Sequence, residues 1–133
     1  MDILFPSSKI YIAKSKISGL GVFARVKIRK GEIIEESPAI VIPKDQLEDI
    51  AKTEMVNYIF FDWQEKLKNG AVVLGYGSLF NHSENNSAEY EIFPAENLIR
   101  FIAKIEINPD EEITTNYHGG DKKSSKLWFE VKS

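Results

Sequence analysis

The feature that most constrains the fold is a series of short apolar runs, each stopped after a few residues by glycine, proline or asparagine. Runs of about four to eight residues with such boundaries are typical of β-strands, whereas helices need longer periodic segments. Only 45–51 places its apolar residues at helical spacing. The chain is therefore predicted to be mainly β with little helix, and we expect strands at 9–14, 22–24, 32–36, 39–42, 58–63, 71–74, 88–93, 98–107 and 112–117.

Two of the boundaries carry specific predictions. Pro38 is expected to separate the strand at 32–36 from the one at 39–42, because proline cannot donate to a β-ladder. Asn69-Gly70 is expected to form the turn of a hairpin that joins 58–63 to 71–74, because this dipeptide favours tight hairpin turns.

The length and composition set the class of protein. A chain of 133 residues can bury a core as one domain, and it has no cysteine for disulfides or cysteine-based zinc sites. It shows no signal-peptide pattern and no apolar stretch long enough to span a bilayer, so we expect an intracellular, soluble protein. Seventeen basic and twenty acidic residues give a net charge of -3, which does not favour direct nucleic-acid binding. The sequence contains no signal for an oligomeric state.

Two segments match the N-glycosylation pattern, Asn81-His82-Ser83 and Asn85-Asn86-Ser87. Glycosylation requires a secretory route, for which the sequence has no signal. We therefore interpret the two matches as accidental.

The residues alone do not define a catalytic constellation. The two histidines, His82 and His118, are far apart, and the two G-x-G pairs are not extended to a nucleotide-binding motif. Several tyrosines lie near the glycine and Asn-His segments, where core packing and a functional role are both open. Without a family resemblance, the residues therefore predict only a β domain with a tyrosine-rich interior.

Three longer segments, taken in order, carry more information. They are SGLGVFARVKIRKGEII, GYGSLFNHSENNSAEYEIF and RFIAKIEINPDEEITTNYHG. In this order they resemble the SET-domain protein-lysine methyltransferases, with the pattern of minimal stand-alone members of the viral and microbial kind. The resemblance spans about 9–119 and implies one SET domain over 1–133, with 120–133 as a tail docking over the site. It also implies an α+β β-clip of several small sheets, closed by a C-terminal pseudoknot, which is an exception to unknotted topology.

The resemblance implies a site for S-adenosylmethionine. Asn81 would offer donors and an acceptor to the amino-acid end of this cofactor. His82 would contribute mainly backbone contacts to the adenine. Gly19, Leu20 and Gly21 would let the main chain approach the cofactor closely.

Tyrosines would complete the site. Tyr117 falls at the family's catalytic tyrosine, whose hydroxyl lies beside the methyl group and the amine. Tyr90 and Tyr58 would line the channel for the substrate lysine, and Tyr90 would influence how many methyl groups are added. The implied reaction is methylation of the ε-amine of lysine in a basic protein, such as a histone, a DNA-packaging protein or a ribosomal protein. It needs no metal and no protein nucleophile, because the cofactor carries the reactive group.

The sequence also departs from the family pattern. Many relatives have cysteine-rich flanks that hold zinc, so here the C-terminal wall must be made otherwise. Trp128 in Leu127-Trp128-Phe129 would cover the adenine or serve as a simple packing anchor. Ser37-Pro38-Ala39 and 84–87 differ from the usual family residues, which affects loop shape and substrate preference more than cofactor binding.

Two other functions compete with an active methyltransferase. One is a SET-like module that binds a basic peptide without turnover. The other, without the resemblance, is a structural β domain of a larger assembly. The joint presence of Asn81, His82 and Tyr117 favours the enzyme, because a module freed from catalysis need not retain all three.

Overall fold

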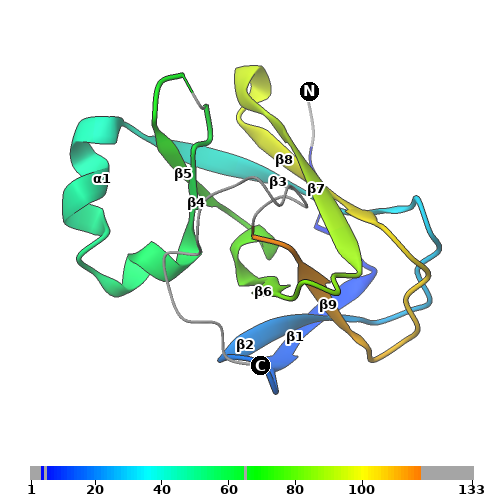
Figure 1. The fold of residues 1–133 in the computed structure, drawn as a ribbon. Helices are drawn as coiled ribbons and strands as arrows, with labels where there is room; N and C mark the ends of the chain where they lie inside the picture. The colour runs from blue at the N-terminus through cyan, green and yellow to red at the C-terminus, as the bar shows by residue number, and fades with distance from the viewer. Residues whose placement is uncertain (1–3, 5, 65, 118–133) are drawn as a thin grey trace.

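The computed structural model describes residues 4, 6–64 and 66–117, and it contains nine strands, one α-helix and three short 3-10 helices in this part of the chain. Figure 1 shows the strands gathered into two sheets, with the α-helix at the far end of the larger one. The mainly β fold predicted from the sequence is confirmed. In chain order the elements are β1 (Ile10–Lys14), β2 (Leu20–Ala24), β3 (Ile33–Ile42), α1 (Lys44–Ile50), η1 (Glu54–Tyr58), β4 (Ile59–Phe61), β5 (Gly70–Val73), η2 (Gly77–Leu79), β6 (Asn81–His82), β7 (Ala88–Phe93), η3 (Pro94–Glu96), β8 (Leu98–Ala103) and β9 (Glu112–Thr115).

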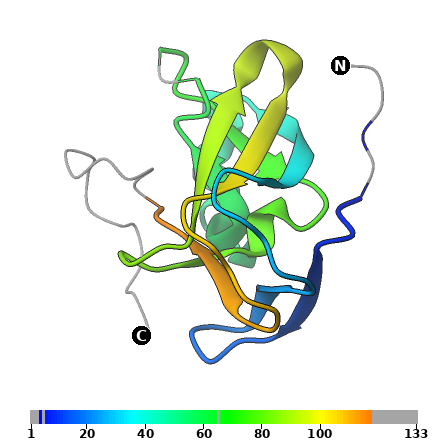
Figure 2. The same cartoon turned by 90° about the vertical axis from the view of Figure 1, so that its right-hand side faces the viewer.

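The smaller sheet joins segments that are far apart in the sequence. Its strand order is β1-β2-β9-β6, so β9 lies between the N-terminal hairpin and the Asn81-His82 strand. In Figure 2 the orange strand β9 lies beside the blue strands of that hairpin. β6 runs parallel to β9, with Asn81 opposite Thr114 and His82 opposite Thr115. This side-by-side placement is the one that the expected crossing of the chain requires.

The larger sheet has the order β4-β5-β3-β8-β7 and is antiparallel throughout. Its inner face packs on the smaller sheet through a core centred on fully buried residues such as Phe101, Ile99 and Val22. A second, smaller cluster forms where Leu47 of α1 covers Ile42 and Ile59. Among the described residues, no helix has the length and apolar character needed to cross a membrane.

The predicted break at Pro38 is wrong, because β3 runs through it as one ten-residue strand. β3 pairs with β8 up to Pro38 and with β5 from Ala39 onward. The Pro38 carbonyl accepts from the Leu74 amide just beyond the end of β5. The proline therefore sits where the strand changes partner from β8 to β5.

The connection between β4 and β5 also differs from the prediction. The two strands form the expected antiparallel hairpin, but Gly70 is already in β5, and the left-handed residues are Asp62 and Lys68, with φ of 55° each. Asn69 uses its side chain instead: its Oδ1 accepts from the Gln64 amide at 2.8 Å, and its Nδ2 donates to the Gln64 Oε1 at 2.9 Å. A wide loop held by one asparagine thus replaces the tight turn.

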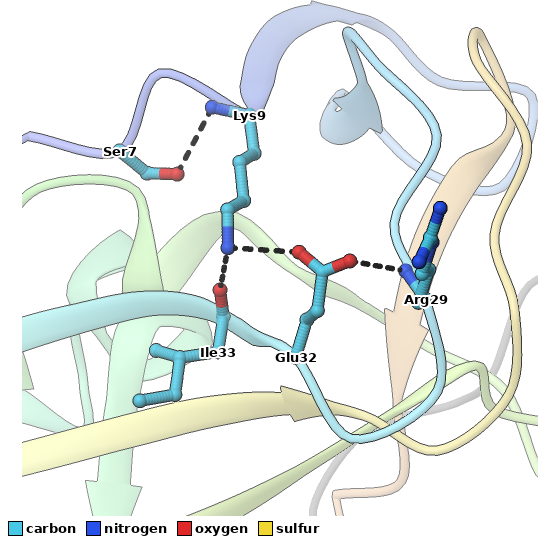
Figure 3. Close-up of polar contacts among 5 residues, drawn as sticks. All are labelled: Ser7, Lys9, Arg29, Glu32 and Ile33. Atoms are coloured by element: carbon cyan, nitrogen blue, oxygen red, sulfur yellow. Dashed lines mark hydrogen bonds and ion pairs between the residues drawn. The ribbon is translucent and has the colours of Figure 1, made fainter.

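A polar contact ties the start of β1 to the start of β3 (Figure 3). The Lys9 ammonium donates to the Ile33 carbonyl at 2.8 Å and lies 3.1 Å from the Glu32 carboxylate, which also accepts from the Arg29 amide. Both charged side chains are about one-third exposed, so the ion pair adds little stability and its main effect is to fix this corner of the fold.

Candidate active site

The candidate site lies where β6 and the end of β9 run side by side. The turn Gly75–Gly77 leads through η2 to Phe80 and then into β6, while β9 continues into Asn116 and Tyr117. The parallel pairing places the predicted cofactor residues of β6 next to the predicted catalytic tyrosine. Side chains that are 35 positions apart in the chain therefore meet at one point.

Tyr117 is held at both of its ends. Its backbone amide donates to Nδ1 of His82 at 2.9 Å, and its hydroxyl donates to the Phe80 carbonyl at 2.9 Å. The rings of His82 and Tyr117 lie 5.0 Å apart between centroids. Because Nδ1 of His82 accepts a hydrogen bond, this nitrogen carries no proton. Sequence analysis expected mainly backbone contacts from His82; the structure adds a side-chain contact that orients Tyr117.

The environment keeps the Tyr117 phenol neutral. Burial raises its pKa to about 12, and the charges of Glu112 and Tyr58 add to the shift. Since the hydroxyl hydrogen is directed at the Phe80 carbonyl, the oxygen presents its lone pairs to the remaining space. The group is therefore arranged to accept hydrogen bonds and not to remove protons.

Asn81 is buried, at 8% exposure, and its amide nitrogen faces three acceptors. These are the carbonyl oxygens of Ser18 and Leu20, at 3.1 and 3.2 Å, and Oε2 of Glu112, at 2.9 Å. The burial and the three hydrogen bonds of Asn81 agree with the interpretation that the sequence match at this position is accidental.

The two glycines of the Gly19–Gly21 segment meet different structural requirements. Gly19 has a φ of +46°, and a side chain there would meet open space. Gly21 is buried, and a Cβ on it would collide with the carboxylate of Glu112 and approach the Cβ of Ser15 to 3.0 Å. The absence of a side chain at Gly21 thus makes room for the carboxylate of Glu112.

The two predicted channel tyrosines lie at different depths. Tyr58 is 41% exposed at the end of η1, not in a strand as predicted, and it is the smallest of the three contributions that raise the pKa of Tyr117. Tyr90 is half-buried in β7, with Phe60 and Phe101 around its ring, and burial raises its pKa. No hydrogen bond of the Tyr90 hydroxyl occurs among the described residues.

Some predicted residues do not join this group. Trp128 lies outside the described residues, as does the whole 120–133 tail. In the described part of the chain, no group of three or more histidine and acidic side chains is arranged to hold a metal ion.

Three residues of this group, Glu112, Ser15 and Phe80, were not predicted from the sequence. The Ser15 hydroxyl donates to the carboxylate of Glu112, and the Phe80 carbonyl receives the Tyr117 hydroxyl. Glu112 lies in an acidic run, 110–112, that resembles a solvated turn. The signal that could have identified it is its strand position before buried Ile113, beside a glycine that leaves room for a carboxylate.

Comparisons with known proteins agree with this geometry. Residues 19–118 match the SET domain family. The chain is 32% identical over 123 residues to a Schizosaccharomyces pombe histone-lysine N-methyltransferase described as H3 lysine-37 specific, covering 92% of this chain and 78% of that protein.

Solved structures give the same result. A candidate histone methyltransferase of Plasmodium falciparum superimposes with a TM-score of 0.68 at 34% identity, over 82% of this chain and 92% of that one. A chain of the Chaetomium thermophilum Polycomb Repressive Complex 2, in a humanized mutant bound to the inhibitor GSK126, has a TM-score of 0.70 at 21% identity. The match covers 90% of this chain and only 16% of that larger one, so it supports the fold alone. With the family match over most of its length, the chain belongs to the SET-domain family and is a protein-lysine methyltransferase.

Proposed function

We propose that this protein transfers a methyl group from S-adenosylmethionine to the ε-amine of a lysine in a histone or a similarly basic protein, and that 1–133 acts as one SET domain. The observation that carries the proposal is the double anchoring of Tyr117 by His82 and by the Phe80 carbonyl, immediately beside Asn81. Such anchoring fixes a hydroxyl to within the precision that positioning catalysis needs.

The residues near Asn81 fit the cofactor. S-adenosylmethionine has a cationic ammonium and a cationic sulfur, and this corner of the site is rich in acceptors: two main-chain carbonyls, the Glu112 carboxylate and the amide oxygen of Asn81. No atom of the described residues lies within 4 Å of a Cβ built on Gly19, so these residues leave room there for the ligand. Asn81, His82 and the Gly19–Gly21 turn would hold the cofactor, and Trp128 is the candidate for a cover over its adenine.

The chemistry requires a neutral amine. A free lysine has a pKa of about 10.4, so only about one in a thousand is neutral near pH 7.4. When bound, S-adenosylmethionine supplies an activated methyl group on a positive sulfur, which the amine nitrogen takes as the carbon–sulfur bond breaks. Aromatic walls desolvate the amine and so lower its pKa, which favours loss of its proton to water before transfer.

The tyrosines would then orient the amine. Tyr117 offers lone pairs, because its own hydrogen is bound to the Phe80 carbonyl and its pKa of about 12 keeps it protonated. Tyr58, at the exposed end, would line the mouth of the channel, and Tyr90, deeper, would face the bound amine or a water beside it. Tyr117 acts in this scheme by orientation, not as a general base.

The substrate class follows from the relatives. The S. pombe relative is described as acting on lysine 37 of histone H3, and the P. falciparum one as a candidate histone methyltransferase. The net charge of -3 is compatible with a basic partner. We therefore propose a histone tail as the substrate, in the cell interior.

The experiment is methyl transfer from isotope-labelled S-adenosylmethionine to a panel of recombinant histones, a bacterial DNA-packaging protein and ribosomal proteins. Label on a lysine of a histone, lost in Tyr117→Phe, supports the proposal. Peptide binding in calorimetry without label would favour the alternative, a SET-like module that holds a basic peptide without turnover.

A further inference from the structure

Glu112 reaches from β9 into the turn between β1 and β2. Its two carboxylate oxygens accept from the Ser15 hydroxyl, at 2.7 and 2.9 Å, and Oε2 also accepts from Nδ2 of Asn81, at 2.9 Å. The turn between β1 and β2, strand β6 and strand β9, which are distant in sequence, are thus joined through one side chain. No ion pair of Glu112 occurs among the described residues.

The position of this carboxylate is closely defined by its surroundings. Glu112 lies opposite Phe23 in the β2–β9 ladder, next to the position where Gly21 has no side chain. A Cβ on Gly21 would occupy the space of Oε2, so the glycine provides the room that the carboxylate needs. Ser15 is fixed in turn, because its Oγ also accepts from the Ile17 amide at 2.8 Å.

These contacts determine which way the Asn81 amide points. Its NH2 group faces the Ser18 and Leu20 carbonyls and Glu112, all of which can only accept. Turning the amide by 180° would place Oδ1 against three acceptors, which is repulsive. Oδ1 forms no hydrogen bond with a described residue, so it remains able to accept one from a ligand.

We infer, on the basis of the proposed function, that Glu112 is a positioning residue for cofactor binding. As a hydrogen-bond acceptor it holds the Asn81 amide in the orientation that presents Oδ1 to the ammonium group of S-adenosylmethionine. It acts through Asn81 and does not itself need to touch the cofactor.

The first test measures cofactor affinity by calorimetry in the wild type and four variants. Glu112→Ala should raise the Kd for S-adenosylmethionine about tenfold, as loss of one orienting hydrogen bond implies. Glu112→Gln should stay near wild type, because its carbonyl oxygen can accept from Asn81 while its NH2 donates to the Ser15 hydroxyl. The double variant Asn81→Ala/Glu112→Ala should bind no more weakly than Asn81→Ala alone, since Glu112 acts through Asn81.

Two controls accompany this series. Glu111→Gln removes a neighbouring charge outside the cluster. The Glu111 Oε1 accepts from the Asn108 amide, and the variant should bind S-adenosylmethionine as tightly as the wild type does. Melting curves separate loss of folding from loss of affinity. A Glu112→Ala protein that binds within twofold of wild type, or a double variant weakened by the product of the single effects, would overturn the inference.

The second test needs no cofactor. The two side-chain NH2 protons of Asn81 can be assigned by the absence of their NMR signals in Asn81→Ala. In the wild type these protons should exchange slowly with solvent water. In Glu112→Ala they should exchange faster, and in Glu112→Gln they should not; unchanged exchange in Glu112→Ala would refute the inference. A wild type that binds no cofactor but retains protected Asn81 protons would overturn the proposed function and leave the orienting contact supported.

Discussion

The two sheets of this protein contribute opposite kinds of environment to one site. The smaller sheet supplies four buried polar side chains, those of Asn81, His82, Thr114 and Thr115. The larger sheet faces the same region with aromatic rings, through Phe60, Tyr90 and Phe101, and its main buried charge is Glu35. The comparison teaches that the cofactor end depends on a few directed hydrogen bonds, whereas the amine end depends on packing and desolvation.

The largest expected effect is at the junction of the two environments. Tyr117→Phe removes the hydroxyl that meets the Phe80 carbonyl and keeps the ring. Turnover should fall about a hundredfold or more, equivalent to about 2.7 kcal/mol, while cofactor affinity changes far less. Initial methylation rates, a cofactor titration and a melting curve check this. A variant that folds, binds cofactor and methylates at nearly the wild-type rate would remove Tyr117 from the mechanism.

Substitutions of two glycines, Gly19 and Gly21, test how closely the side chains of the smaller sheet are packed. Gly21→Ala should cost about 2 kcal/mol of unfolding free energy and weaken cofactor binding, because the new methyl displaces the Glu112 carboxylate. Gly19→Ala should cost about 1 kcal/mol, because it strains a positive φ but meets open space. Urea unfolding and calorimetry measure both. Equal effects of the two substitutions would contradict the close contact at Gly21.

The buried charge of the larger sheet gives a pH test. Burial raises the pKa of Glu35, against the opposing effect of hydrogen bonds from the Ser37 hydroxyl and the Tyr76 amide. From its ordinary value of 4.5 up to the raised pKa, the folded protein keeps a proton that the unfolded chain has lost. The contribution to stability is therefore complete below pH 4.5 and is lost as pH rises through the folded pKa. Glu35→Gln should reduce this loss of unfolding free energy with rising pH, as measured by urea unfolding at several pH values. If the free energy of unfolding changed with pH equally in both proteins, the raised pKa of Glu35 would be contradicted.

The smallest effect is expected from a single oxygen on the aromatic side. Tyr90→Phe should leave stability and cofactor affinity nearly unchanged, because its ring contacts with Phe60 and Phe101 are retained. If its hydroxyl faces the channel, its loss makes room for further methyl groups on the bound amine. Mass spectrometry of a reacted histone peptide should then show more di- and trimethylated product. An identical product distribution would assign Tyr90 to core packing.

The sequence predicted the strands better than their partners. The predicted ranges 9–14, 88–93 and 112–117 contain the whole of β1, β7 and β9. Pro38 and Asn69-Gly70 were misread, because a proline can sit where a strand changes partner and an asparagine can hold a loop with its side chain. Both errors come from tertiary context overriding local preference.

The site was predicted in part for a similar reason. The resemblance placed Asn81, His82 and Tyr117, which the structure brings together. It gave no role to Glu112, because its meaning depends on Ser15 and Asn81, 97 and 31 positions away. The periodicity of apolar residues predicts the strand or helix to which a residue belongs. It contains no information on contacts with residues that are distant in the sequence.

The central position of β9 has a consequence for biosynthesis. This strand is among the last described segments to leave the ribosome, yet it must enter between β2 and β6 to complete the smaller sheet. Until then the nascent chain carries an unpaired edge on β2, a surface prone to association with other chains. We expect products truncated before residue 112 to aggregate or to be captured by chaperones, whereas release of β9 completes the smaller sheet and brings Tyr117 beside His82 in a single event.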